Sequence, residues 1–432
     1  MTYTLVILNA KLSDGRMLNI GCAGTRIQAM TTGPLKGDMV IDAGGRWVAP
    51  GIIDVHTHIR DMELSQKEDW VSASAAAARG GITTVCDMPN TRPATFDAEG
   101  LRAKWRAAAR STVNYGINFG VTEYNHDEME KVTGINAFKI FMAESSAGYV
   151  VEAMDVIRRV MEIARRRNIP LMVHSELQSC VEAHHQRYAM TMSNHHLLRH
   201  RECAIRATER LLYLQKETGA PLYIAHVSTA EEIELIARAK QAGQKVWCEV
   251  TPHHLFLDHG VAEKAGHYAK VNPPLREKHH SHALQQAVAD GVVDTIGTDH
   301  APHTLEEKAR PYPEAPSGFP GLETSLGLML QMYHQGQIDK TRLEQMMCTA
   351  PARIFNMKDR GILREGAYAD IIIVDEERPW RVDPAAFFTK ARYSPFKDML
   401  LKGQVITTIV NGQPVWHDNR LRPTKGMPLE YH

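Results

Sequence analysis

The sequence predicts an α/β protein, a (β/α)8 TIM barrel with a small β-sandwich domain formed from both termini. Eight short apolar runs recur through the middle of the chain, at about 50–58, 82–88, 113–121, 136–143, 170–175, 221–227, 245–251 and 292–298. The stretches between them, such as 150–167 and 229–242, have helical spacing and are rich in Ala, Glu and Arg. Alternating strands and helices imply a parallel sheet, and eight units over roughly 250 residues favour a barrel. Periodicity alone leaves a doubly wound sheet as an alternative.

Both ends of the chain carry short strand-like runs broken by turn residues. They lie at 4–8, 26–30 and 39–41 near the start, and at 369–375 and 405–410 near the end. Asn411-Gly412 follows the last of these and is a hairpin turn signal. We therefore expect residues 1–50 and 365–432 to pair into one β-sandwich domain, and residues 51–364 to form the barrel domain.

The composition limits the class of protein. The chain has 432 residues, 44% of them apolar and 23% charged, which is typical of a folded globular protein. Lys and Arg together number 50, as do Asp and Glu, and no basic stripe stands out, so a nucleic-acid partner is not expected. No apolar run is long enough for a membrane span, and the start of the chain indicates a strand, not a signal peptide. The six cysteines are scattered without a Cys-x-x-Cys pair, so we expect reduced thiols and a cytoplasmic location.

Polar side chains gather at the C-terminal ends of the predicted strands, where a barrel of this type carries its active site. His56 and His58 are two residues apart on one strand and therefore project to the same side, as two ligands of a divalent metal would. The later strand ends add Lys139, His174, His226 and Asp299. A lone histidine at a strand end is more often structural, but four of them with an aspartate favour a metal site.

Three histidine pairs lie away from these strand ends. They are His184-His185, His195-His196 and His279-His280. Because they stand in polar or helical segments, we expect them on the solvated surface.

Lys139 stands inside the apolar run Phe138-Lys139-Ile140-Phe141-Met142, where an unpaired ammonium would be costly to bury. One interpretation is a neutral or ion-paired lysine, and another is a buried stem whose head reaches water. A third fits a metal site better. A neutral amine that adds CO2 becomes a carbamate, and the two oxygens of that anion can bridge two cations.

Taken in order, these motifs resemble those of the cyclic amidohydrolases, and among them most closely the dihydroorotases. The segments that carry the resemblance are 54–60, 67–69, 88–91, 138–139, 174–176, 226–228, 248–254, 272–276, 298–303 and 321–324. They cover nearly the whole chain. The resemblance implies a barrel flanked by a β-sandwich from both termini, in agreement with the independent prediction.

The resemblance also implies a binuclear metal centre with two Zn2+ ions per subunit. His56, His58 and Asp299 would bind the first ion, and His174 and His226 the second. Lys139, as N6-carboxylysine, would bridge the two. Asp54 would support these ligands from outside. Mn2+ and Co2+ suit the same donors, so the sequence leaves the metal open. A homo-oligomer, a dimer or a tetramer, is implied as well.

The activity implied is the reversible hydrolysis of dihydroorotate to N-carbamoyl-aspartate by a hydroxide shared between the metals, with Asp299 as the catalytic proton carrier. Arg60 would grip the carboxylate of this small cyclic amide, because a guanidinium binds a carboxylate bidentately. The other substrate contacts implied are Asn90, Asn272, His303, Ser317 and Gly318. Ser145 matches a loop that covers the site in the animal enzyme.

Several alternatives remain open at this point. Arg60 can instead pair with Asp61 or Glu63, and Asn90 can simply form a turn. Asp61-Met62-Glu63 also departs from the acidic-Pro-Gly pattern of dihydroorotases, which weakens the substrate assignment without affecting the metal ligands. An allantoinase or a hydantoinase/dihydropyrimidinase on the same scaffold is the first alternative function. A scaffolding relative without activity is the second, although such proteins have lost ligands that this chain retains.

Overall fold

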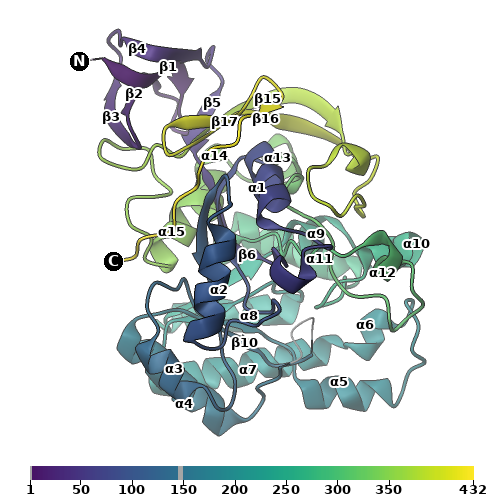
Figure 1. The fold of residues 1–432 in the computed structure, drawn as a ribbon. Coiled ribbons are helices and arrows are strands. Elements are labelled where there is room, and N and C mark those ends of the chain that lie inside the picture. Colours follow the sequence, from purple (N-terminus) through teal and green to yellow (C-terminus); the bar gives the residue numbers. More distant parts are fainter. Residues whose placement is uncertain (1, 145–148) are drawn as a thin grey trace.

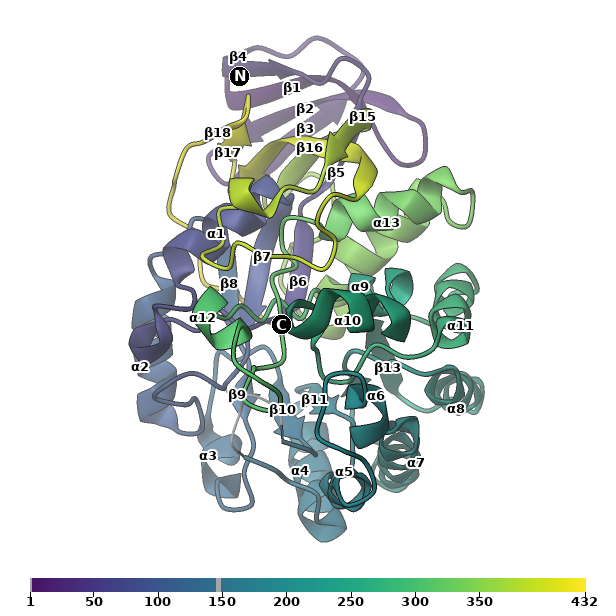
Figure 2. The same ribbon diagram turned by 90° about the vertical axis from the view of Figure 1, so that its right-hand side faces the viewer.

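The computed structural model describes residues 2–144 and 149–432, so the predicted Ser145 loop contact lies outside the described residues. A ring of parallel strands occupies the centre of the molecule (Figure 2). Its strands are β6 (Ile52–Thr57), β7 (Ile82–Asp87), β8 (Asn114–Ile117), β9 (Phe119–Gly120), β10 (Phe138–Phe141), β11 (Leu171–His174), β12 (Leu222–Ile224), β13 (Val246–Val250) and β14 (Thr295–Ile296). Each of the predicted apolar runs contributes to this ring, and the run at 113–121 is divided between β8 and β9.

The ring consists of two parallel arcs, β6-β7-β8 and β9-β10-β11-β12-β13-β14. Chain continuity joins them between β8 and β9. At the other seam an isolated parallel bridge pairs Thr57 with His300, and the His58 N–H donates to the His300 carbonyl at 2.7 Å. The first and last strands of the barrel therefore meet at their C-terminal ends, which places their terminal side chains next to each other.

Helices cover the outside of the strand ring (Figures 1 and 2). They are α1 (Trp70–Arg79), α2 (Ala98–Ala108), α3 (His126–Lys131), α4 (Met154–Arg167), α5 (Gln178–His185), α6 (His195–Leu198), α7 (Arg201–Thr218), α8 (Ala230–Gln241), α9 (Pro252–Phe256), α10 (His259–Ala265), α11 (Lys278–Ala289), α12 (Leu305–Lys308), α13 (Ser325–His334), α14 (Lys340–Glu344) and α15 (Ala350–Ile354). Local chemistry defines their ends. Thr229 and Glu232 form a capping box at the start of α8, and Gly219, in a left-handed conformation, ends α7.

The two ends of the chain meet in one mixed sheet above the barrel, as predicted (Figure 1). Its strands are β1 (Tyr3–Lys11), β2 (Met17–Ala23), β3 (Arg26–Thr31), β4 (Gly37–Asp42), β5 (Trp47–Pro50), β15 (Ile371–Arg381), β16 (Leu400–Val410), β17 (Gln413–His417) and β18 (Arg420–Leu421). The antiparallel pair β5–β15 joins the N-terminal strands to the C-terminal strands. Asn411 and Gly412, with φ of 50° and 77°, form the predicted turn between β16 and β17.

The last residues of the chain leave this sheet and run beside the barrel. The Tyr115 N–H of β8 donates to the Met427 carbonyl at 3.0 Å, and the Leu429 N–H donates to the Tyr115 carbonyl at 2.9 Å. The C-terminal segment thus ties the terminal sheet to the outside of the barrel. Across the described residues, no helix combines the length and the apolar character needed to span a bilayer.

The prediction of reduced cysteines is wrong for one pair. Cys180 of α5 and Cys203 of α7 form a disulfide with a Cα–Cα distance of 5.4 Å, whereas Cys22, Cys86, Cys248 and Cys348 are free and buried. The two cysteines are 23 residues apart in sequence, and only the packing of their helices brings them together.

The prediction that three histidine pairs lie on the surface is wrong for one member of each pair. His184, His195 and His280 are buried, whereas His185 and His279 are exposed and His196 is half-buried. Neighbouring residues on a helix point about 100° apart, so a helix packed on one face turns one of two adjacent histidines inward. The polar character of a segment does not reveal which one.

Candidate metal centre and active site

His56, His58 and Asp299 meet at the seam between the first and last barrel strands. His56 belongs to β6, His58 follows it, and Asp299 follows β14 in a left-handed backbone conformation with φ of 47°. The Nε2 atoms of His56 and His58 lie 3.4 Å and 3.1 Å from the same oxygen, Asp299 Oδ1. All three side chains are buried, and their ligand atoms lie within 4.8 Å of one another, as the donors of one metal ion do.

The other nitrogens of these two rings have oxygen partners. His56 Nδ1 lies 2.7 Å from Glu249 Oε1, and His58 Nδ1 lies 2.7 Å from Asn90 Oδ1. A carboxylate or amide oxygen accepts a hydrogen bond from Nδ1–H, and a proton on Nδ1 leaves the Nε2 lone pair available for a metal. Burial lowers the pKa of His58 to about 3, so this ring is neutral near pH 7.

Asp299 is the carboxylate on which both rings converge. Burial by itself raises the pKa of Asp299. The neighbouring His56 and His58 outweigh that effect and hold the pKa of this carboxyl well below its usual range. Asp299 is therefore an anion at neutral pH, which is the form that binds a cation.

His174 and His226 form a second group on the adjacent strands. His174 ends β11 and His226 follows β12, and His174 Nδ1 lies 3.0 Å from His226 Nε2. His174 Nε2 lies 2.9 Å from Glu176 Oε2, a carboxylate partner like that of His56. The His226 ring is 5.1 Å from the His56 ring, centroid to centroid, so the two groups are neighbours.

Lys139 of β10 is fully buried, which excludes the interpretation that its head reaches water. Its Nζ has no hydrogen-bond partner among the described residues. Burial lowers the pKa of this amine to about 8, although the charges of Glu249 and Asp299 oppose the shift. Burial, and to a smaller extent the charge of Lys139, lowers the pKa of His174 and of His226, so the amine is within electrostatic reach of this second group.

These donors fit a divalent metal. Imidazole nitrogens and a carboxylate oxygen are the ligands that zinc and related ions take from proteins. A buried amine without a partner is costly in the unmodified form. Among the predicted ligands, the structure therefore brings together four imidazoles, one carboxylate and the lysine.

A pocket of about 360 Å³, including its open mouth, lies over these side chains. Its walls include His56, His58, His174, His226 and Asp299, and three predicted substrate residues, Asn272, Ser317 and Gly318.

The other predicted substrate residues lie directly behind the pocket wall. Asn90 contacts His58, as described above. Arg60 Nη2 lies 3.2 Å from His303 Nε2, and that nitrogen lies 3.0 Å from the Ser317 carbonyl oxygen in the wall. Burial and the charge of Arg60 lower the pKa of His303 to about 3, so the ring beside the guanidinium is neutral.

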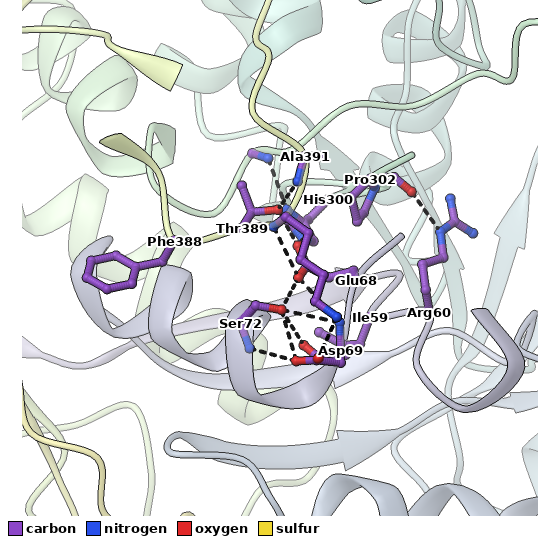
Figure 3. A network of polar contacts seen from close by, with 12 residues as sticks. Ile59, Arg60, Glu68, Asp69, Ser72, His300, Pro302, Phe388, Thr389 and Ala391 are labelled. Carbon is purple, nitrogen blue, oxygen red and sulfur yellow. Dashed lines mark hydrogen bonds and ion pairs between the residues drawn. The ribbon is translucent and has the colours of Figure 1, made fainter. Parts of the chain in front are cut away.

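Two acidic residues near Arg60 in the sequence, Asp61 and Glu68, have other partners. Figure 3 shows the Arg60 side chain pointing away from the cluster around Glu68 and toward Pro302, whose carbonyl accepts the Arg60 Nε–H at 3.3 Å. Glu68 is buried and accepts the hydroxyls of Ser72 and Thr389. Asp61 is paired with Arg110 at 2.6 Å. Burial lowers the pKa of Arg60, and Asp299 is the charge that opposes this shift most strongly.

The loop that departs from the dihydroorotase pattern has an unusual backbone. Arg60, Asp61 and Met62 all have positive φ, between 50° and 64°, which is uncommon for residues other than glycine. The Asp61 carboxylate accepts the N–H groups of Met62 and Trp70. Asp61 thus stabilises this turn, and the turn holds Arg60 in its position.

Two residues at the site have no predicted role. Glu249 is fully buried within β13, and its oxygens contact His56, the His226 N–H at 3.1 Å and the Tyr223 hydroxyl at 2.9 Å. The signal that identified Lys139, a charge inside an apolar strand, is also present at Glu249. Arg199, whose Nη2 lies 2.6 Å from Glu176 and 3.3 Å from His174, comes from a polar segment and has no comparable signal.

With this geometry in place, comparisons with known proteins assign the family. Residues 47–415 match the family model described as the amidohydrolase family. The chain belongs to this family. This amidohydrolase is 35% identical over 418 residues to a dihydroorotase of Halobacterium salinarum, covering 95% of this chain and 96% of the relative. It is 37% identical to a dihydroorotase of Geobacter metallireducens, covering 88% and 90% of the two chains.

Among solved structures, an L-hydantoinase (dihydropyrimidinase) from Arthrobacter aurescens has the same fold. Its TM-score is 0.95 at 30% identity, and the match covers 98% of each chain. The predicted family resemblance and the predicted TIM barrel are therefore confirmed. The candidate metal ligands of this amidohydrolase lie at the C-terminal ends of its barrel strands, where enzymes with this fold carry out their chemistry.

Proposed function

We propose that this amidohydrolase is a dihydroorotase, which interconverts dihydroorotate and N-carbamoyl-aspartate. The observation that carries the proposal is the buried Arg60 guanidinium beside His303, directly behind the pocket wall. Dihydroorotate has a carboxylate, whereas hydantoin, dihydrouracil and allantoin do not. A buried guanidinium forms strong, charge-assisted hydrogen bonds with a carboxylate. The dihydroorotase relatives that match along nearly the whole chain support the same choice.

Other residues at the pocket offer further contacts to the substrate. Asn272 Oδ1 is buried without a hydrogen-bond partner in the described chain, so it is available to accept a ring N–H. Ser317 and Gly318 offer backbone groups from the same wall. Asn90 contacts the substrate from beside His58, and its oxygen also orients that ring.

We propose that the centre holds two Zn2+ ions, for which Mn2+ and Co2+ are alternatives. His56, His58 and Asp299 would hold one ion, and His174 and His226 the other. Lys139, converted to N6-carboxylysine by addition of CO2 at Nζ and loss of a proton, would be a ligand shared by the two. When bound, the metals lower the pKa of a water molecule and polarise the amide carbonyl. The support is the convergence of ring nitrogens in each group and the buried Lys139 amine, which has no hydrogen-bond partner among the described residues.

Asp299 is the catalytic residue in this proposal. Its carboxylate is held as an anion at the centre of the site, so it can accept a proton and pass it to the leaving ring nitrogen. Arg60 and the pocket wall orient the ring so that the reacting amide faces Asp299. Proton transfer over hydrogen-bond distance requires this alignment.

A panel of cyclic amides tests the substrate. We expect turnover of dihydroorotate and little or none of hydantoin, dihydrouracil and allantoin. The second candidate function, a hydantoinase or dihydropyrimidinase, is favoured by the structural match to the Arthrobacter aurescens enzyme. Hydrolysis of the neutral rings without hydrolysis of dihydroorotate would replace our proposal with this one.

Substitution of Arg60 tests the carboxylate contact directly. Arg60→Gln should raise KM for dihydroorotate by roughly 10- to 100-fold, because a charge-assisted bidentate contact is lost. Arg110→Gln is the matched control, since Arg110 pairs with the adjacent Asp61 but is half exposed at the surface. Equal effects of the two substitutions on KM would show that Arg60 only shapes the loop.

A further inference from the structure

A second group of metal-ligating side chains lies outside the active site, where α5 packs against the start of α7. Cys180 and His184 are four residues apart on α5 and therefore share one face of the helix. Cys203 lies in the first turn of α7. The ligand atoms of these three buried residues lie within 4.8 Å of one another. The same distance limit groups His184 with His200 and Glu202.

His184 provides the second observation. Its side chain is only 6% exposed, and its Nδ1 is buried without a hydrogen-bond partner in the described part of the chain. The ring is stacked against His200 and Tyr188, which satisfies neither nitrogen. A buried, unpaired polar nitrogen costs free energy unless something binds it. The disulfide accounts for both sulfurs but gives this nitrogen no partner.

We propose that Cys180, His184 and Cys203 bind a structural Zn2+ ion when the Cys180–Cys203 disulfide is reduced, with His200 as the fourth ligand. Two thiolates and two imidazoles are a preferred ligand set of closed, structural zinc sites. The ligands come in two short pairs, Cys-x3-His on α5 and His-x2-Cys at the start of α7. His200 is a better fourth ligand than Glu202, because structural zinc sites use cysteine and histidine and Glu202 is exposed.

A dithiol or a phosphine can reduce the Cys180–Cys203 disulfide. Two electrons from the reductant break the S–S bond. A dithiol supplies the two protons and becomes a disulfide, whereas a phosphine becomes its oxide and water supplies the oxygen and both thiol protons. The thiols release their protons as the metal binds. Bond lengths of about 2.0–2.3 Å place tetrahedral zinc ligands roughly 3.5 Å apart, and the ligand atoms of Cys180, His184 and Cys203 already lie within 4.8 Å of one another. His200 would exchange its 3.3 Å contact with the Glu202 N–H for the metal.

A metal bound at this site would stabilise the packing of α5 against α7 near the active site. The Leu177 N–H, just before α5, donates to the Cys203 carbonyl at 3.1 Å. His200 is preceded by Arg199, which contacts Glu176 and His174. A metal at this junction would therefore hold the α5–α7 contact behind His174 without touching the substrate.

Cobalt titration of the full-length, phosphine-reduced protein tests the proposal. Thiolate ligation to Co2+ produces a charge-transfer band in the near ultraviolet, and the candidate active-site ligands contain no sulfur. We expect the band in the wild-type protein, and one more bound metal ion per chain than in Cys203→Ser. The band should disappear in Cys203→Ser and persist in Cys22→Ser, a matched substitution of a buried free cysteine in the terminal sheet.

The wild-type spectrum decides the question even if a variant fails to fold. Reduced wild-type protein that lacks the band would overturn the proposal and leave the pair as a disulfide only. A band that survives in both Cys180→Ser and Cys203→Ser would also overturn it, because the sulfur would then come from elsewhere. Turnover of dihydroorotate is not part of the readout, so the result is independent of the proposed activity.

Discussion

His56 Nδ1 lies 2.7 Å from Glu249 Oε1, and both side chains are buried inside the barrel. This contact joins the first strand of the barrel to the seventh. It sets which nitrogen of His56 carries the proton and fixes the plane of the ring. The second carboxylate oxygen is held in turn by the Tyr223 hydroxyl. Glu249 thus orients a candidate metal ligand without occupying the metal site itself.

We expect Glu249→Gln to weaken metal binding by roughly 10- to 100-fold, as is typical when a carboxylate that orients a ligand histidine is neutralised. Equilibrium dialysis against a metal buffer measures the change. Tyr223→Phe is the matched control, because it removes a partner of the other oxygen and leaves the contact with His56 in place. Unchanged metal affinity in Glu249→Gln would contradict the orienting role.

Lys139→Met should abolish turnover and bridging of the metals without destabilising the protein. The substitution removes a buried amine that has no hydrogen-bond partner among the residues described, and replaces it with an apolar side chain of similar length. Lys104→Met is the contrasting variant, because Lys104 is buried in an ion pair with Asp87 at 2.8 Å. Loss of that partner should lower the free energy of unfolding by about 3–5 kcal/mol.

Turnover, metal content and thermal unfolding are measured for Lys139→Met and Lys104→Met. The first should lose turnover and keep its stability, whereas the second should lose stability. Short carboxylic acids should partly restore turnover in Lys139→Ala, since they supply the missing bridging oxygens. Near wild-type turnover in Lys139→Ala without such acids would disprove the bridging role.

The acid stability of the protein should depend on Glu307. Burial alone would raise the pKa of this carboxyl, but the His303 ring 3.6 Å away and the ion pair with Lys67 at 2.8 Å hold the pKa below its usual range. A depressed carboxyl pKa stabilises the fold above the ordinary value of about 4.3, and this contribution is lost as the pH falls through the lower, folded-state pKa. Wild type should exceed Glu307→Gln by on the order of 1 kcal/mol at neutral pH, with the difference vanishing in acid.

Urea unfolding of the wild type and of Glu307→Gln across this acid range measures the effect. The exposed Glu209→Gln is the control and should follow the wild-type curve. A difference between wild type and Glu307→Gln that stays constant with pH would mean that the carboxylate charge is not responsible.

The turn at Gly412 should tolerate no side chain. Its φ is 77°, and an added Cβ would lie 2.2 Å from the Gly24 carbonyl oxygen. Gly366 has a similar φ of 86° but open space around it. We expect Gly366→Ala to cost about 1–2 kcal/mol through backbone strain alone, and Gly412→Ala to cost a further 1–3 kcal/mol, roughly, through the clash. The urea midpoints of the two variants compare these costs, and equal midpoints would argue against the clash.

The residues that sequence reasoning identified share one property. Lys139 and His56 are polar residues at the ends or in the middle of apolar strands, where they interrupt a local pattern. Glu249 interrupts its strand in the same way, but its partner could not be inferred. Arg199 and the Cys180–Cys203 pair come from segments with no such contrast, so nothing local indicated their positions.

By itself, the sequence determined the barrel strands, the pairing of the chain ends and the side chains that stand at the strand ends. These features follow from hydrophobic periodicity and turn chemistry, which act over a few neighbouring residues. Only the tertiary structure decided which of these side chains meet. The closure of the barrel brings His56 to Asp299 and to Glu249, and helix packing brings Cys180 to Cys203. Such contacts depend on how distant elements pack, and no short stretch of the chain encodes that geometry.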